Sequence, residues 1–242
     1  MRKSLHNIFI YFTLAVFIFS SCKDDSYLKN VIVPNQSFVE EFDTASAALA
    51  RGWQFINNSE LKGGGVWQNG GSLIPLFAGY SNHGTYAGFI GTDYTSTSAA
   101  AAIISNWLIS PPVILQNGDK IIFYTRSQAL DNGAGDSTDY GNSLQVNINT
   151  HNSGIFVGNY TDVGDFDKRI LAINPTFIQS SYTNPVAGSY PTRWTRFEAT
   201  VAGVNSPVLG RFAFRYFVQG GGSNGLASGI GIDSVAYQSV KK

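Results

Sequence analysis

Apolar and polar side chains alternate with a period of two in several short stretches of the chain. In residues 144–149, Leu, Val and Ile alternate with Gln, Asn and Asn. In residues 211–218, Phe, Phe, Tyr and Val alternate with Arg, Ala, Arg and Phe. Successive side chains of a strand point to opposite faces, so this alternation predicts half-buried β-strands. Similar stretches predict further strands at 38–42, 51–56, 66–68, 86–90, 194–201 and 230–237.

A pair of prolines at 111–112 interrupts a long apolar stretch. Residues 106–110 precede the prolines and residues 113–115 follow them. Proline has no N–H for a sheet ladder, so the pair is expected at a sheet edge or at a break between two strands. Asn-Gly at 117–118 then leads into another apolar stretch at 120–126. Asn-Gly between two apolar stretches favours a β-hairpin.

Helical signals are few. The alanine-rich residues 44–50 predict one helical turn, and residues 166–173 predict a short helix before an Asn-Pro pair. Many short strands, glycine-rich turns and almost no helix of ten residues predict an all-β protein, a two-sheet β-sandwich of jelly-roll topology. Neither an internal repeat nor a break in composition divides residues 37–242, so we expect one domain there.

Residues 1–21 have the features of a lipoprotein signal peptide. Two basic residues precede an apolar segment at 8–19, which is shorter than the roughly 20 residues that span a bilayer. Two serines then lead into Cys22, which resembles the lipobox of bacterial lipoproteins, a family in which the cysteine is acylated after cleavage. Residues 22–36 are polar and are expected to form a lipid-anchored tether.

The lipobox resemblance implies a location on the outer membrane, with Cys22 as the lipidation site. Lys-Asp-Asp at 23–25 resembles the signal that sends some lipoproteins to the outer face of that membrane, so we expect cell-surface exposure. Cys22 is the only cysteine, and the exported domain therefore has no intramolecular disulfide.

The composition argues against several classes of function. The formal net charge is zero and charged residues make up 13% of the chain, which gives no reason to expect a nucleic acid partner. Only His83 and His151 remain after the signal peptide, and neither a His-Glu-x-x-His pattern nor a Gly-x-Ser-x-Gly elbow is present. We therefore predict that the protein is not an enzyme. Paired carboxylates for glycoside cleavage stay open, because they need only a suitable separation in space.

Three acids form a candidate Ca²⁺ site. Glu40 alternates with Phe38 and Phe42, so it points where apolar side chains point, and a buried lone carboxylate is costly. The first and last strands of a jelly roll usually lie side by side, which would bring Glu40 and Asp43 near Asp233. Clustered acids repel each other unless a cation lies among them, and Ca²⁺ suits carboxylate oxygens. The alternative is that Glu40 pairs with a cation, for which the sequence offers Arg211, Arg215 or a strand end.

Two tyrosines are candidates for contact with a ligand. Tyr182 and Tyr190 lie in a predicted loop rich in Ser, Thr, Asn and Pro, where exposed rings can stack on sugars. Trp53 and Trp107 are expected in the core, since burial of each side chain stabilises the folded state by roughly 2–3 kcal/mol.

Five stretches follow one another along nearly the whole exported chain, at 38–43 with 52–53, 106–115 with 117–119, 173–175 with 190–195, 210–218 and 231–233. Together they resemble the choice-of-anchor J domain, which is related to cleaved-adhesin domains and to MAM-like jelly rolls. Asn142 departs from this resemblance, because members of the family often carry Asp before the strand that starts at Leu144.

The resemblance implies a β-jelly roll, a surface location and binding rather than catalysis. The related adhesin domains bind Ca²⁺, which supports calcium as a cofactor. We therefore expect a non-catalytic surface binding or adhesion module, with a glycan or a matrix protein as its ligand. The alternatives are an accessory component of a surface glycan-uptake complex and, with least support, a carbohydrate-active enzyme.

Overall fold

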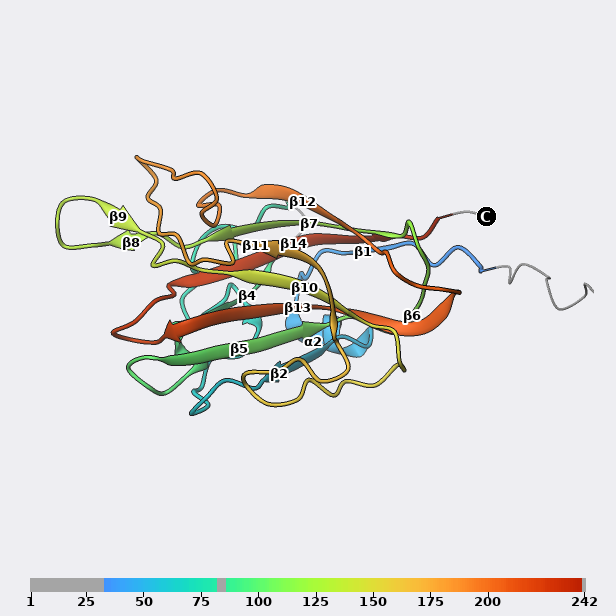
Figure 1. Cartoon of the computed structure of the whole chain (residues 1–242). Coiled ribbons are helices and arrows are strands. Elements are labelled where there is room, and N and C mark those ends of the chain that lie inside the picture. The colour runs from blue at the N-terminus through green and yellow to red at the C-terminus, as the bar shows by residue number, and fades with distance from the viewer. Residues whose placement is uncertain (1–32, 82–85, 241–242) are drawn as a thin grey trace, which may run out of the picture. The chain divides into compact units, whose positions relative to one another are not determined.

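A computed structural model of the chain describes residues 33–81 and 86–240. Two antiparallel sheets pack face to face as a sandwich (Figure 1), which confirms the all-β, two-sheet prediction. The predicted signal peptide and Cys22 lie outside the described residues, as does most of the tether, and they stay predictions. In the part that is described, no helix is long and apolar enough to cross a membrane.

One sheet, here called the β7 sheet, has six strands. Its order is β12 (Thr195–Thr200), β7 (Lys120–Ser127), β14 (Gly229–Gln238), β4 (Ile90–Asp93) and β3 (Gln68–Asn69), and β1 (Phe38–Glu40) also pairs with β14. The other sheet, here called the β13 sheet, has the order β11 (Lys168–Ile173), β10 (Leu144–Asn149), β13 (Val208–Gly221), β5 (Ala102–Ile109) and β2 (Gln54–Asn57), and β6 (Val113–Leu115) also pairs with β13.

Short elements complete the domain. The predicted helical turn is present as α2 (Ala45–Ala50), and a 3-10 helix, η3 (Tyr94–Ser96), follows β4. A separate hairpin of β8 (Leu130–Asp131) and β9 (Ser137–Thr138) lies between β7 and β10. The chain passes repeatedly from one sheet to the other, as jelly rolls do: between β1 and β2, β2 and β3, β4 and β5, β6 and β7, β11 and β12, β12 and β13, and β13 and β14, and from β7 to β10 through the β8–β9 hairpin.

Strand β13 supplies much of the core between the sheets. Phe212, Phe214, Tyr216 and Val218 are fully buried there, as their alternation predicts. The Phe212 ring lies 5.8 Å from the ring of Trp53 and 5.8 Å from that of Tyr237, so it joins both sheets.

A second apolar cluster lies on the outer face of the β13 sheet. Trp107 and Ala213 pack there against Val157 and Phe166, which belong to the segment 150–167. Asn147 and Asn149, which point outward from β10, are therefore buried, whereas Gln145 is only partly buried; the alternation with the core residues is as predicted. Trp107 is buried as expected, but in this outer cluster rather than between the sheets.

The prolines at 111–112 separate β5 from β6, as predicted, and both strands pair with β13. The Asn-Gly pair does not form a hairpin, because β6 belongs with β13 whereas β7 pairs with β12 and β14. Contacts distant in sequence hold this turn. Asn117 Nδ2 donates to the carbonyl of Val204 at 2.8 Å, and Val204 N donates to Asn117 Oδ1 at 2.9 Å.

The helix predicted at 166–173 is wrong, because Lys168–Ile173 forms strand β11. This segment pairs along its length with β10, and pairing with a neighbouring strand outweighs a local helical preference. The strand predicted at 86–90 begins only at Ile90.

Replacing Phe212 by Ala should destabilise the domain by about 3–5 kcal/mol, because it removes the ring that fills the space between the sheets. Leu209→Ala on the same strand is the matched control, since Leu209 is 53% exposed and its loss should cost less than about 1 kcal/mol. Urea unfolding measures both values. Equal losses for the two variants would contradict this description of the core.

Candidate functional site

Glu40 lies where the sequence predicts but has a different partner. Strands β1 and β14 are neighbours, with Glu40 opposite Val235. The Glu40 carboxylate is 3% exposed and accepts hydrogen bonds from Arg51 Nε at 2.7 Å and Arg51 Nη2 at 2.5 Å, and from the backbone N–H of Phe42 at 3.0 Å. The salt-bridge alternative therefore holds for Glu40, with Arg51 as the cation.

The expected cations have other roles. Arg211 donates to the carbonyls of Ser110 and Ser153, and Arg215 lies on the outer face of the β13 sheet. Arg51 reaches Glu40 because it is the C-cap of α2, where the chain turns back toward β1. Helix α2 separates Glu40 from Arg51 along the chain, and no pattern in the sequence predicted that these two side chains would pair.

The other two acids of the predicted calcium site have separate surroundings. Asp43 is exposed, whereas Asp233 is fully buried on the outer face of the β7 sheet. Asp233 Oδ2 accepts hydrogen bonds from the N–H groups of Tyr80 and Ser81 at 2.8 and 3.0 Å. Across residues 33–81 and 86–240, no three His, Cys, Asp or Glu side chains are grouped so as to hold a metal ion. Calcium binding stays a prediction of the sequence.

The two tyrosines proposed from the sequence differ in exposure. Tyr182 is 39% exposed, and its hydroxyl accepts a hydrogen bond from Arg126 Nη2 at 2.6 Å. Tyr190 is fully buried, and its hydroxyl lies 2.6 Å from Thr125 Oγ1. The expectation that Tyr190 is exposed for ligand contact is wrong, because this ring fills the core beside β7. Burial also raises the pKa of the Tyr190 hydroxyl.

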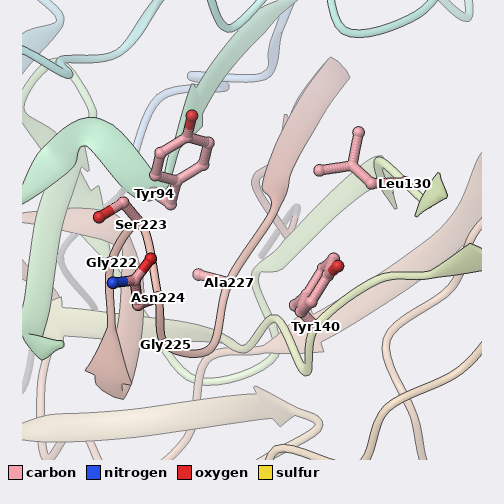
Figure 2. A pocket seen from close by; sticks show the side chains of 8 residues that line it. All are labelled: Tyr94, Leu130, Tyr140, Gly222, Ser223, Asn224, Gly225 and Ala227. Carbon is pink, nitrogen blue, oxygen red and sulfur yellow. The ribbon is translucent and has the colours of Figure 1, made fainter. Parts of the chain in front are cut away.

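A pocket of about 290 Å³ lies at one end of the sandwich, and we call it the loop-end pocket. Figure 2 shows that its lining comes from three parts of the chain: the start of η3, the region from β8 to β10, and the loop between β13 and β14. These parts contribute Tyr94, Leu130, Tyr140, residues 222–225 and Ala227.

The floor of the loop-end pocket has an unusual backbone. Tyr140 has a φ of 54° and Ala227 a φ of 80°, a left-handed region that residues with a Cβ seldom adopt. The N–H of Ala227 donates to the carbonyl of Tyr140 at 2.7 Å and joins the two. Strained positions of this kind persist only where the surrounding structure holds them, and they gather at ligand sites.

Asn142 supplies that support. Its Nδ2 donates to the carbonyl of Asp139 at 2.6 Å and to Ser228 Oγ at 2.8 Å. Its Oδ1 accepts from the Tyr216 hydroxyl at 2.6 Å and from the N–H of Ser228 at 3.2 Å. A fully buried amide thus fixes the residues that precede Tyr140 and follow Ala227, and such satisfied networks make a site rigid.

The lining of the loop-end pocket is partly polar and partly apolar and carries no charged side chain. Tyr94 and Tyr140 present aromatic rings with hydroxyl groups, and Ser223 and Asn224 are exposed on the loop between β13 and β14. Asp, Glu, His, Lys and Cys side chains do not line this pocket, so no side-chain base stands there beside the hydroxyl groups of Tyr94, Tyr140 and Ser223. The arrangement suits the binding of a neutral ligand that has both apolar faces and hydroxyl groups.

Neither the protein-family models nor the curated protein sequences give a match to the chain. Among solved structures, the K1 cleaved adhesin domain of Lys-gingipain from Porphyromonas gingivalis W83 is 19% identical, with a TM-score of 0.51, over 84% of this chain and 98% of its own. The K2 cleaved adhesin domain of Lys-gingipain is 16% identical over 85% and 99%, with a TM-score of 0.48.

A xylan-binding module is 11% identical over 85% of this chain and 99% of its own, with a TM-score of 0.41. At such identities a likeness shows the fold alone. The chain therefore has a cleaved-adhesin-like β-sandwich, which confirms that part of the resemblance. The resemblance to choice-of-anchor J domains stays a prediction.

Asp233 should make stability depend on pH. Burial raises the pKa of its carboxyl group to about 6, against the effect of the N–H donors of Ser81 and Tyr80. An unfolded Asp has a pKa of about 3.9, so between about pH 4 and pH 6 the folded state binds this proton more tightly. The contribution of Asp233 to the free energy of unfolding should therefore fall as the pH rises through this window, by on the order of 1–2 kcal/mol.

Urea unfolding of the wild type and of Asp233→Asn at pH 5 and pH 7 isolates this contribution from other titrating groups. The wild type should lose more stability between the two values than the variant loses. The same pH dependence in both proteins would show that Asp233 titrates in its ordinary range.

Proposed function

We propose that this protein is a non-catalytic binding module for glycans, with the loop-end pocket as its binding site. The observation that carries the proposal is a rigid, uncharged pocket that contains the rings of Tyr94 and Tyr140. The shared fold with an adhesin domain is in keeping with a binding role. Lipidation of Cys22 would hold the module at the outer membrane, a part of the proposal that rests on the sequence.

A sugar ring matches the chemistry of the loop-end pocket. Its C–H faces pack on aromatic rings, and its hydroxyl groups exchange hydrogen bonds with Tyr, Ser and Asn side chains. The network around Asn142 holds the floor in place before a ligand arrives, which lowers the entropy lost on binding. A neutral sugar needs no compensating charge, and the lining offers none.

A glycan array probed with the full chain should identify neutral oligosaccharides that bind, and calorimetry then gives their Kd. Tyr94→Ala should weaken binding by about tenfold or more, because it removes an aromatic contact from the pocket. Tyr182→Ala is the control, since Tyr182 is an exposed tyrosine outside the lining and should leave the Kd unchanged. Circular dichroism checks that both variants fold.

Two results would overturn the proposal. The first is an array on which no neutral glycan binds. The second is a loss of glycan affinity in Tyr182→Ala but not in Tyr94→Ala. That result would place the binding site at the loop that holds Tyr182, as the sequence predicts.

A further inference from the structure

A second pocket, of about 430 Å³, lies on the outer face of the β13 sheet, and we call it the outer-face pocket. Strands β10, β11 and β13 form its base, and the segment 161–167 forms one side. It shares no lining residue with the loop-end pocket. The groups that matter for its chemistry are Asn147, Asp167, Arg169, Arg215 and Phe217.

Arg215 is a buried cation with neutral partners. It is 2% exposed, and it donates from Nε to Ser105 Oγ at 2.9 Å and from Nη2 to the carbonyl of Tyr160 at 2.9 Å. Its guanidinium lies between two rings, 4.1 Å from the centre of Phe217 and 5.0 Å from that of Trp107. No carboxylate forms an ion pair with it within the described ranges.

Such an arrangement leaves a favourable place for an anion. Burial of a charge without a counter-charge is costly, and it lowers the pKa of Arg215 to about 10. The carboxylate of Asp162 acts on Arg215 only through space and does not pair with it. An anionic group bound against the guanidinium would supply the missing charge and a strong hydrogen bond.

Asn147 adds a hydrogen-bond acceptor. It is 2% exposed, and its Nδ2 donates to the carbonyl of Phe166 at 3.0 Å. Its Oδ1 is buried and has no hydrogen-bond partner in the described part of the chain. Buried acceptors without a partner are rare and costly, so a ligand that brings an O–H or N–H group to this atom gains affinity.

Two charged side chains complete the rim. Arg169 of β11 stands opposite Asn147 in the strand register and is exposed, and it belongs to none of the ion pairs within the described ranges. Asp167 Oδ2 lies 3.0 Å from Nε2 of His151, a residue outside the pocket lining, so this carboxylate has a partner of its own. The pocket thus has two arginines for one ligand anion.

We propose that the outer-face pocket binds a carboxylate-bearing sugar, the uronate ring of an acidic glycan. The carboxylate accepts from Nη1 of Arg215, the guanidinium nitrogen that has no partner among the described residues, and Arg169 also reaches it. A ring hydroxyl donates to Asn147 Oδ1, and the edge of the half-buried Phe217 packs on the sugar ring. This site is independent of the neutral-sugar site proposed at the other pocket.

Calorimetry of the full chain with α-1,4-trigalacturonate and with the corresponding neutral galactose trimer, at fixed ionic strength, tests the proposal. We expect the uronate to bind at least tenfold more tightly than the neutral trimer. Arg169→Gln should weaken uronate binding about tenfold or more, because one charge-assisted hydrogen bond is lost. Arg193→Gln is the matched control, since Arg193 is an exposed arginine that precedes β12 in the other sheet and should not change the Kd.

Arg215→Gln should abolish uronate binding. If this substitution of a buried residue prevents folding, the Kd of Arg169→Gln alone tests the proposal. Tyr94→Ala should leave uronate binding intact, which separates this site from the loop-end pocket. Undetectable binding of trigalacturonate at millimolar concentration would overturn the proposal. So would equal affinity for the two trimers, or an unchanged Kd in Arg169→Gln.

Discussion

Strand β13 carries alternate side chains to two faces with different neighbours, and this two-residue period constrains the rest of the structure. Phe212, Phe214 and Tyr216 face the core between the sheets, while Arg215 and Phe217 face the outer side. A shift of one residue in its register would exchange the two sets and place the arginine in the core. The core and the outer-face pocket therefore depend on the same pairing of β13 with β5 and β10.

The same strand also supports the other pocket. The Tyr216 ring is part of the core, but its hydroxyl reaches Asn142, whose amide fixes the residues beside Tyr140 and Ala227. The core packing of Tyr216 thus helps to hold the left-handed backbone at Tyr140 and Ala227, which would otherwise relax. The glycine-rich stretch at 220–225, which leads from β13 toward β14, lies next to this floor.

Local alternation predicted strands such as β10, β13 and β14, because burial on one face of a sheet leaves a period-two pattern. It also predicted that Glu40 is buried, but not that Arg51 pairs with it, since that contact requires the chain to fold back after α2. The region 166–173 shows the limit of local patterns, because its pairing with β10 decides its structure.

The candidate sites were harder to predict for a related reason. Tyr94, Tyr140 and Asn224 come from distant segments, and a left-handed φ at Tyr140 has no signature in a sequence without glycine at that position. The loop that holds Tyr182 and Tyr190 looked exposed by composition, yet Tyr190 turns inward to Thr125. Alternation places Arg215 on the face of β13 opposite to the core residues, but its contact with Trp107 depends on the pairing of β13 with β5.

The pairing of β1 with the far end of β14 has a mechanical consequence. Strand β14 has ten residues and extends over about 30 Å. It starts beside the loop-end pocket and ends beside β1, where the described chain enters (Figure 1). Tension between residue 33 and a ligand held in that pocket would run along the strands, across the hydrogen bonds of the β1–β14 ladder. The force would load all hydrogen bonds of this ladder at once instead of opening them one at a time. For this reason even the short strand β1 would resist being pulled away from β14.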